Sequence, residues 1–192
     1  MKDFRPELTY TSFEEHMHKA KTPLQLKHLE TVVHHSKGEV LADLDMVLPT
    51  LSDDPKYHEY GVLGNVKGDT GPKGIDEVRA NYTEMVNSGS YVIESKKTRV
   101  VVGDYDIVTE GTFRQILTAE VARKMGFVDD KSPATPFYLL SARTVVFWEF
   151  NEDDKATGED RYVLDHHIVP LAEEDLPDNY PDKFRTKPRG EA

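Results

Sequence analysis

Hydrophobic residues in the second half of the chain form the alternating patterns and unbroken runs that are typical of β-strands. The stretch 98–115 contains three consecutive valines at 100–102, a Gly-Asp turn signal at 103–104, and a second β-branched and aromatic run from Tyr105 onward. Two such runs joined by Gly-Asp predict a β-hairpin of 91–102 with 105–117. Further strands are predicted at 137–150 and 161–171, which favours a curved antiparallel sheet.

The first half instead shows the three- and four-residue spacing of amphipathic helices. One helix is predicted from a hydroxyl cap at Thr22 to a stop at Gly38, and a second over 39–48. A third is predicted over 75–87, ended by Gly89. Shorter predicted elements are a helix that begins with a cap at Ser12 and ends at Lys21, a strand at 56–60 and a helical turn at 118–125. Helices followed by antiparallel strands indicate an α+β fold.

Composition narrows the class of protein. The chain has 192 residues, no cysteine and a formal net charge of −11. The negative charge argues against nucleic-acid binding, because it would repel phosphates and the sequence has no concentrated patch of basic residues to overcome the repulsion. No apolar run approaches the length of a membrane span, and the first residues lack the apolar core of a secretory signal. We therefore expect a cytoplasmic, single-domain protein that binds neither nucleic acid nor membranes.

Several segments, in this order and spacing, carry a family resemblance. They are 47–60 (VLPTLSDDPKYHEY), 74–82 (GIDEVRANY), 100–111 (VVVGDYDIVTEG), 133–136, 143–153 (RTVVFWEFNED) and 161–171. Together they resemble the SnoaL-like branch of the NTF2-like (nuclear transport factor 2-like) superfamily. The resemblance covers 22–172 and leaves 1–21 as an N-terminal extension and 173–192 as a C-terminal tail, which we expect to follow the surface or to be mobile.

The resemblance implies a cone made by a strongly curved antiparallel sheet wrapped around three N-terminal helices. Members include ketosteroid isomerase, scytalone dehydratase, polyketide cyclases, epoxide hydrolase and lyases for lignin-derived aromatics, besides non-enzymatic binders. It therefore implies a pocket and does not fix a reaction. It also implies a homodimer formed by pairing two sheets.

The segment 57–60 is the densest group of residues suited to proton transfer. Strand alternation places His58 and Tyr60 on one side, with Tyr57 on the other. In the functional interpretation His58 is a general acid or base and Tyr60 stabilises a developing oxyanion. In the alternative interpretation these residues form a strand end with packed rings and a solvated histidine.

A second candidate group comes from the strands. Alternation places Glu110 and Arg114 on one side of their strand, Asp165 with Arg161 on one side of the last strand, and His166 on the other. Charges spaced this way usually form cross-strand ion pairs on a solvent face. The alternative is that Glu110, Arg114, Arg143 and Asp165 or His166 reach the mouth of the cone, where arginine holds an anionic group and an acid moves a proton.

No cofactor or metal site is predicted. Adjacent histidines such as His34 and His35 point apart on a helix, and no two-histidine-plus-carboxylate spacing appears. Aromatic residues, among them Tyr57, Tyr82 and Trp148, are numerous enough to line a substrate cavity.

The predicted function is a cofactor-independent acid–base enzyme that acts as a dehydratase, isomerase or carbon–carbon lyase on a small apolar or aromatic substrate. Its predicted catalytic residues are His58, Tyr60, Glu110, Asp165 and His166, and its predicted substrate-binding residues are Tyr57, Tyr82, Arg114, Arg143 and Trp148. The alternative is a non-catalytic ligand-binding or dimerising module of the same fold. Convergence of His58 with one of the charged strand residues in one cavity would favour the enzyme.

Overall fold

The computed structural model describes residues 1, 3–61 and 68–187. Its five strands form one sheet in the order β1-β5-β4-β3-β2. The strands are β1 (His58–Tyr60), β2 (Ile93–Val102), β3 (Asp106–Thr118), β4 (Phe137–Phe150) and β5 (Ala156–Leu171). Neighbours are antiparallel except that β1 pairs with β5 in parallel, so the sheet is mixed where the sequence predicted an antiparallel one. The α+β class is confirmed.

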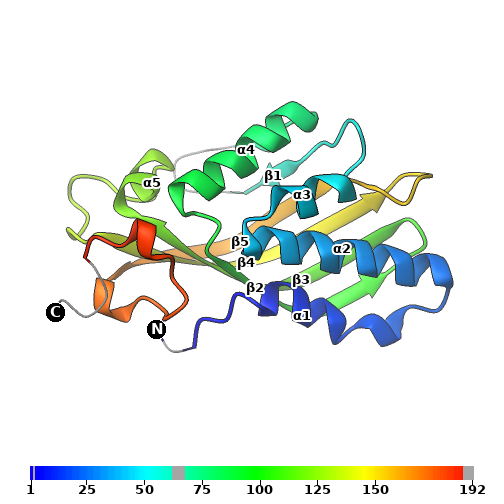
Figure 1. The fold of residues 1–192 in the computed structure, drawn as a ribbon, viewed down its shortest axis with the longest axis horizontal. Helices are drawn as coiled ribbons and strands as arrows, with labels where there is room; N and C mark the ends of the chain where they lie inside the picture. Colours follow the sequence, from blue (N-terminus) through cyan, green and yellow to red (C-terminus); the bar gives the residue numbers. More distant parts are fainter. Residues whose placement is uncertain (2, 62–67, 188–192) are drawn as a thin grey trace.

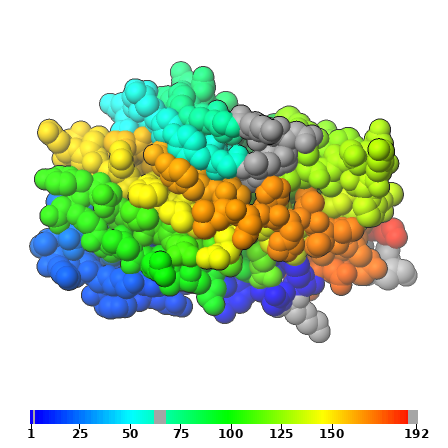
Figure 2. Space-filling view, turned by 180° about the vertical axis from the view of Figure 1, so that it is seen from behind, coloured from blue at the N-terminus to red at the C-terminus, as the bar shows by residue number. Residues whose placement is uncertain are grey.

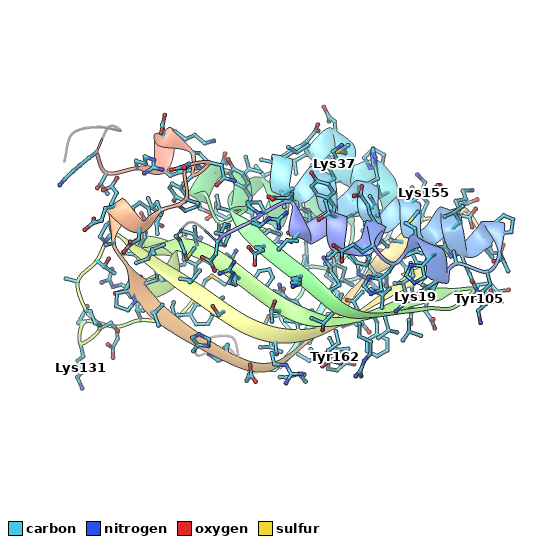
Figure 3. The ribbon with its side chains drawn as sticks, turned by 90° about the horizontal axis from the view of Figure 1, so that it is seen from below. Lys19, Lys37, Tyr105, Lys131, Lys155 and Tyr162 are labelled. Atoms are coloured by element: carbon cyan, nitrogen blue, oxygen red, sulfur yellow. The ribbon has the colours of Figure 1, made fainter. Side chains whose placement is uncertain are left out.

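Helices cover one face of the strongly bent sheet (Figures 1 and 3). The helices are α1 (Leu8–Glu14), α2 (Pro23–Leu41), α3 (Leu44–Val47), α4 (Ile75–Ser88) and α5 (Ala119–Lys124), with 3-10 turns at Met17–Lys19, Leu48–Thr50, Glu173–Asp175 and Asp182–Phe184. We call the face that contacts α2 and α4 the inner face and the opposite one the outer face. The main core lies between the inner face and the helices, and includes Leu29, Val32, Val78, Ile107 and Trp148.

The predicted hairpin is present as β2 and β3. Gly103 donates its backbone N–H to the carbonyl of Asp106 across the turn, at 2.8 Å. The pairing shifts by one residue at Thr98, between Lys97 and Arg99. This β-bulge lets Lys97 face inward while Arg99 faces outward.

The helix boundaries of the first half differ from the prediction in two places. α1 begins at Leu8 rather than at a Ser12 cap, because the Ser12 hydroxyl donates to the carbonyl of Leu8 from inside the helix. The Thr22 cap is confirmed, but α2 continues through Gly38 to Leu41. Gly38 is not a stop signal; it allows α3 to approach, since a Cβ there would lie 2.8 Å from Val47 Cγ2. The predicted helix over 39–48 is therefore split between α2 and α3.

The two ends of the chain pack together at one end of the sheet. Phe4 from the N-terminal extension and Leu176 and Tyr180 from the tail are buried against Ile116 and Phe137. The tail is thus anchored as far as its described residues go, by apolar burial that the sequence pattern did not predict. The start of the chain and the described part of the tail thus lie at the same end of the molecule (Figure 1).

The close contact at Gly38 gives a stability test. Gly38→Ala should lower the free energy of unfolding by about 1–2 kcal/mol, because overpacking against Val47 outweighs the gain in helix propensity of about 1 kcal/mol. Urea denaturation measures it, with the exposed neighbour Lys37→Ala as a control expected to stay within about 0.5 kcal/mol. Stabilisation by Gly38→Ala would show that α3 does not pack this tightly.

Candidate functional site

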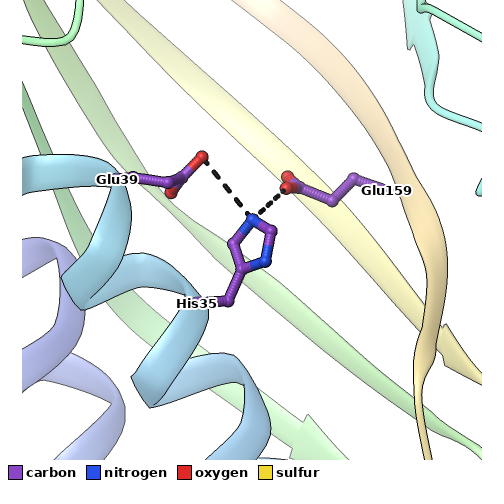
Figure 4. A group of neighbouring side chains, drawn as sticks. All are labelled: His35, Glu39 and Glu159. Atoms are coloured by element: carbon purple, nitrogen blue, oxygen red, sulfur yellow. Dashed lines mark ion pairs between the residues drawn. The ribbon is translucent and has the colours of Figure 1, made fainter. Parts of the chain in front are cut away.

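A group of polar side chains lies on the inner face, where a core would otherwise be apolar. The strand register places Glu159 and Arg161 of β5 on the same face as Trp148 and Val146 of β4. Opposite them, α2 supplies His35 and Glu39 from one helical face, four residues apart (Figure 4). We name the set His35, Glu39, Tyr57, Tyr82 and Glu159 the acid–base cluster.

His35 is fully buried and sits at the centre of this cluster. Its Nδ1 lies 2.7 Å from Thr50 Oγ1, and its Nε2 lies 2.9 Å from the Tyr82 hydroxyl. The ring of Trp148 meets it edge-on, with centroids 5.1 Å apart. These contacts fix the ring in one orientation.

Two carboxyl groups approach the same imidazole nitrogen. His35 Nε2 is 3.8 Å from Glu39 Oε1 and 3.7 Å from Glu159 Oε1 (Figure 4). The Tyr82 hydroxyl donates to Glu39 Oε1 at 3.0 Å, and the Tyr57 hydroxyl is 3.2 Å from that of Tyr82. Five groups able to exchange protons or to stabilise charge are therefore linked in one buried network.

Burial sets the protonation states of the cluster. It lowers the pKa of His35 to about 3, helped by the charges of His34 and Lys97. Burial raises the pKa of Glu159 well above its ordinary value, and the charge of Glu39 adds to this rise. Burial also raises the pKa of Glu39, while the Tyr82 hydrogen bond opposes the rise. The cluster thus favours a neutral imidazole, and it favours the protonated form of Glu159 more strongly than water does.

The two tyrosines remain protonated for the same reason. Burial raises the pKa of both Tyr57 and Tyr82 well above the ordinary value, with the carboxyl groups adding to it. They are hydrogen-bond donors at every pH where the protein works.

Two cations flank the cluster, and each has partners of its own. Lys97 Nζ donates to the carbonyl of Thr9 at 2.6 Å and to that of Ser95 at 3.3 Å. Burial lowers the pKa of Lys97 to about 8, against the charges of Glu39 and Glu159. Arg161 forms an ion pair with Glu59 of β1. Their charges therefore act on the cluster from a distance.

A small cavity adjoins Arg161 on the inner face. Its volume is about 10 Å³, room for about one water. Its lining is mainly apolar and is made by Phe113, Gln115, Met125, Leu140, Ala142, Thr144, Arg161 and Val163. This cavity among the described residues is far smaller than the hollow predicted for the cone.

A wider groove of about 290 Å³ lies elsewhere, along the outer side of β3, β4 and β5. Its lining includes three residues predicted from sequence, Arg114, Arg143 and Asp165. Its charges are largely paired, since Arg114 binds Glu94 at 2.7 Å and Asp3 at 3.0 Å.

Most of the predicted catalytic residues lie on the outer face. His58 Nδ1 is 2.6 Å from Asp69 Oδ2, and the imidazole stacks on Tyr60. Glu110 bridges Arg99 and Arg143 at 3.1 and 2.6 Å. The Glu110 contacts are the cross-strand ion pairs on a solvent face that the sequence analysis gave as the usual arrangement of such charges.

The remaining predicted residues divide between the two faces. Asp165 pairs in register with Arg143 on the outer face. His166 faces inward but contacts the Phe127 ring, away from His35. Tyr57 and Tyr82, predicted as substrate-binding, belong to the acid–base cluster, and Trp148 contacts it through His35. His58 therefore does not meet its expected partners in one cavity.

A β-bulge explains one wrong side assignment. Val163 pairs with Thr144 and Asp165 pairs with Arg143, so Leu164 has no partner in the register. Simple alternation places Arg161 and Asp165 on one side, whereas the bulge turns Arg161 inward and Asp165 outward.

Sequence reasoning missed His35, Glu39 and Glu159 as site residues. His35 was considered only as one of an adjacent histidine pair, which cannot ligate together. The available signal was its position on the apolar stripe of Leu29 and Val32, with Glu39 one turn further along. Glu159 gave no comparable signal, because only the register of β5 brings it under α2.

The raised pKa of Glu159 predicts that this residue destabilises the fold at neutral pH. The unfolded chain ionises Glu159 near 4.5 while the native protein retains the proton, so native stability falls as pH rises through this window. Glu159→Gln should remove the effect and be more stable than wild type at pH 7. The difference should grow from pH 4.5 by up to about 1.4 kcal/mol per pH unit.

Urea denaturation from pH 4 to 8 measures this difference, with the exposed acid Glu152→Gln on the same hairpin as a control. Equal pH dependence of Glu159→Gln and wild type would mean that Glu159 ionises normally in the folded protein.

No protein-family model matches the sequence, and neither does any curated protein. Solved structures do match. One is a protein of Jannaschia sp. CCS1 described as a SnoaL-like polyketide cyclase, 11% identical, with 76% of this chain and 90% of that chain aligned and a TM-score of 0.54. Another is an NTF2-like protein of Burkholderia pseudomallei K96243, 19% identical over 71% of this chain and 90% of that chain, with a TM-score of 0.50. A third is an LEH-like epoxide hydrolase of M. tuberculosis, 14% identical over 71% and 82%, with a TM-score of 0.51.

At these identities the likeness concerns the fold. In the described part of the chain, none of the helices has the length and apolar character that crossing a membrane requires. The fold predicted from sequence is confirmed: the chain folds as the SnoaL-like and NTF2-like proteins do.

Proposed function

We propose that the chain is a cofactor-independent, cytoplasmic acid–base enzyme whose reaction centre is the acid–base cluster. The observation that carries this proposal is the pair of half-buried carboxyl groups, 3.7 and 3.8 Å from one buried imidazole nitrogen, with two tyrosine hydroxyls beside them. Acid–base enzymes raise the pKa of carboxyl groups by burial in this way. A purely structural core gains nothing from two such groups.

The two carboxyl groups have different roles in the proposal. Glu39 accepts the Tyr82 hydrogen bond, which favours its ionised form, so it is the base that removes a proton from carbon next to a carbonyl group. Glu159 holds a proton and is the acid that returns one to the substrate, at carbon or at a leaving hydroxyl. Tyr57 and Tyr82 donate hydrogen bonds to the enolate oxygen that forms between these steps. Isomerisation, dehydration and carbon–carbon cleavage all fit this scheme.

The surroundings favour a small, uncharged, largely apolar or aromatic carbonyl compound. Phe113, Val163 and Leu140 line the cavity beside Arg161, and Trp148 borders the cluster. Lys97 and Arg161, the described cations that flank the cluster, are occupied by Thr9 and Glu59, which leaves no counter-ion for an anionic substrate. The descriptions of two structural neighbours as a cyclase and an epoxide hydrolase support an enzyme.

A second candidate is a non-catalytic ligand-binding module of the same fold. The observation against catalysis is the cavity beside Arg161, whose volume of about 10 Å³ is far below that of a typical substrate site. Under the enzyme proposal, the inner face opens before substrate enters.

A substrate screen decides between the acid–base enzyme and the non-catalytic module. Aromatic and ketonic compounds are tested by thermal shift, and those that bind are tested for turnover. Glu159→Gln and Tyr82→Phe should each lower kcat by about 100-fold or more, because each removes a group that acts in proton transfer or oxyanion stabilisation.

His58→Ala serves as the matched variant on the outer face and should keep at least half of wild-type turnover. Loss of turnover in His58→Ala alone would move the reaction centre to the outer face, as the sequence predicted. Binding without turnover of any bound compound would favour the non-catalytic module.

We also propose that the protein forms a homodimer through an outer apolar patch, defined as Tyr60, Phe147, Tyr162 and Leu164. Tyr162 stacks on Tyr60 and meets Phe147 edge-on, and Phe147, Tyr162 and Leu164 remain 39–57% exposed. Tyr162 points away from the helices (Figure 3), and Figure 2 shows the β5 segment exposed on the side of the molecule opposite to the view of Figure 1. Alternating charges of Arg99, Glu110 and Arg143 flank the patch, and a two-fold axis can pair them with opposite charges of a second copy.

Light scattering tests the dimer. Wild type should have the mass of two chains, and Tyr162→Glu should have the mass of one, because burying a carboxylate in the patch is costly. Tyr105→Glu, at the exposed tip of the β2–β3 hairpin, is the matched control and should stay dimeric. A monomeric wild type, or a dimeric Tyr162→Glu, contradicts this interface.

A further inference from the structure

The proton on His35 can be assigned from its hydrogen-bond partners. The Thr50 hydroxyl donates its single proton to the carbonyl of Val47, at 2.6 Å. It can therefore only accept from His35 Nδ1, which lies 2.7 Å from it. Since the imidazole is neutral, Nδ1 carries the proton and Nε2 presents a lone pair.

That lone pair points into a space surrounded by oxygen atoms. Glu39 Oε1 and Glu159 Oε1 lie 3.8 and 3.7 Å away, and the three ligand atoms fall within 4.8 Å of one another. The Tyr82 hydroxyl lies 2.9 Å from Nε2 and also donates to Glu39 Oε1 at 3.0 Å. The fully buried imidazole nitrogen thus faces two carboxyl groups and one tyrosine hydroxyl.

The local charge also favours a cation in this space. Glu39 and Glu159 both face it, whereas Lys97 is held by Thr9 and Ser95, and Arg161 is held by Glu59. His35 itself stays neutral because of its burial. Of the described side chains, only His35 brings a nitrogen within 4.0 Å of a Glu159 carboxyl oxygen.

We propose that His35, Glu39 and Glu159 form a binding site for one transition-metal dication of the Zn²⁺ type. One imidazole and two carboxylates suit Zn²⁺ and Co²⁺, while Mg²⁺ prefers oxygen ligands and its own waters. Bonds of about 2.0–2.2 Å from one ion require ligand atoms about 3–4 Å apart, which the two nitrogen–oxygen distances already meet. The Thr50–Val47 chain supports the site, since it fixes the tautomer that a metal requires.

The proposed metal is an inhibitor of the proposed enzyme and not its cofactor, and only this consequence rests on the proposed function. Binding occupies the lone pair of His35 and carboxylate oxygens of Glu39 and Glu159, so the cluster can no longer move protons.

Co²⁺ titration of the untagged full-length chain, without any substrate, tests the site. The protein is first treated with a chelator, and Co²⁺ binding is followed by its d–d absorption bands, then by displacement with Zn²⁺. One equivalent should bind, and Mg²⁺ in large excess should not displace it. Glu159→Gln should weaken binding at least about 100-fold, more than loss of an outer-shell partner costs.

Two further variants complete the design. His35→Asn should weaken Co²⁺ binding as much as Glu159→Gln does. If His35→Asn does not fold, the result for Glu159→Gln still decides the test. His58→Asn, which removes the histidine paired with Asp69 on the outer face, should leave the affinity unchanged. No binding by wild type, equal binding by Glu159→Gln, or displacement by Mg²⁺ would each overturn the site.

Turnover separates this proposal from the proposed function. Zn²⁺ should inhibit a turnover that survives chelator treatment. Metal binding lost in Glu159→Gln while turnover persists would leave the metal site standing and reject the reaction centre. If turnover is lost in Glu159→Gln and the wild type binds no metal, the reaction centre stands and the metal site is rejected.

Discussion

The desolvation of two carboxyl groups around one imidazole is the constraint on which the site depends. Glu39 and Glu159 lie among α2, α4 and the inner face of the sheet, where little water is left to stabilise two negative charges at such short range. Burial therefore raises the pKa of Glu159 and lowers the pKa of His35. The fold thereby stores protons in a place where a substrate could use them, at a cost in stability.

The architecture accounts for how these groups meet. α2 contributes two of them because residues four apart share a helical face, and its Thr22 cap and the close contact at Gly38 fix its position against α3. The bent sheet brings Glu159 of β5 under that helix. The 3-10 turn after α3 places the Thr50 hydroxyl against His35, so one short segment both ends the helical layer and orients the ring.

Sequence patterns predicted the elements well and the site poorly, for physical reasons. Period-two and period-3.6 repeats reflect burial, so the hairpin, α4 with its Gly89 end, and the long strands followed directly from them. The repeats did not predict which face each strand residue occupies, because the bulges at Thr98 and Leu164 each reverse the alternation that follows. Gly38 was misread because a glycine that permits helix contact and one that ends a helix look alike in sequence. His35 and Glu39 carried a usable i, i+4 signal, whereas Glu159 depended on register alone.

The most direct test of the account is a ¹³C NMR titration of the glutamate side-chain carboxyl groups in the folded protein. The account predicts that two resonances, assigned by their loss in Glu39→Gln and Glu159→Gln, titrate above the ordinary value of 4.5, with that of Glu159 the further displaced. If both titrate at or below 4.5 with the other glutamates, the buried proton store does not exist, and the reaction centre proposed for this fold is wrong.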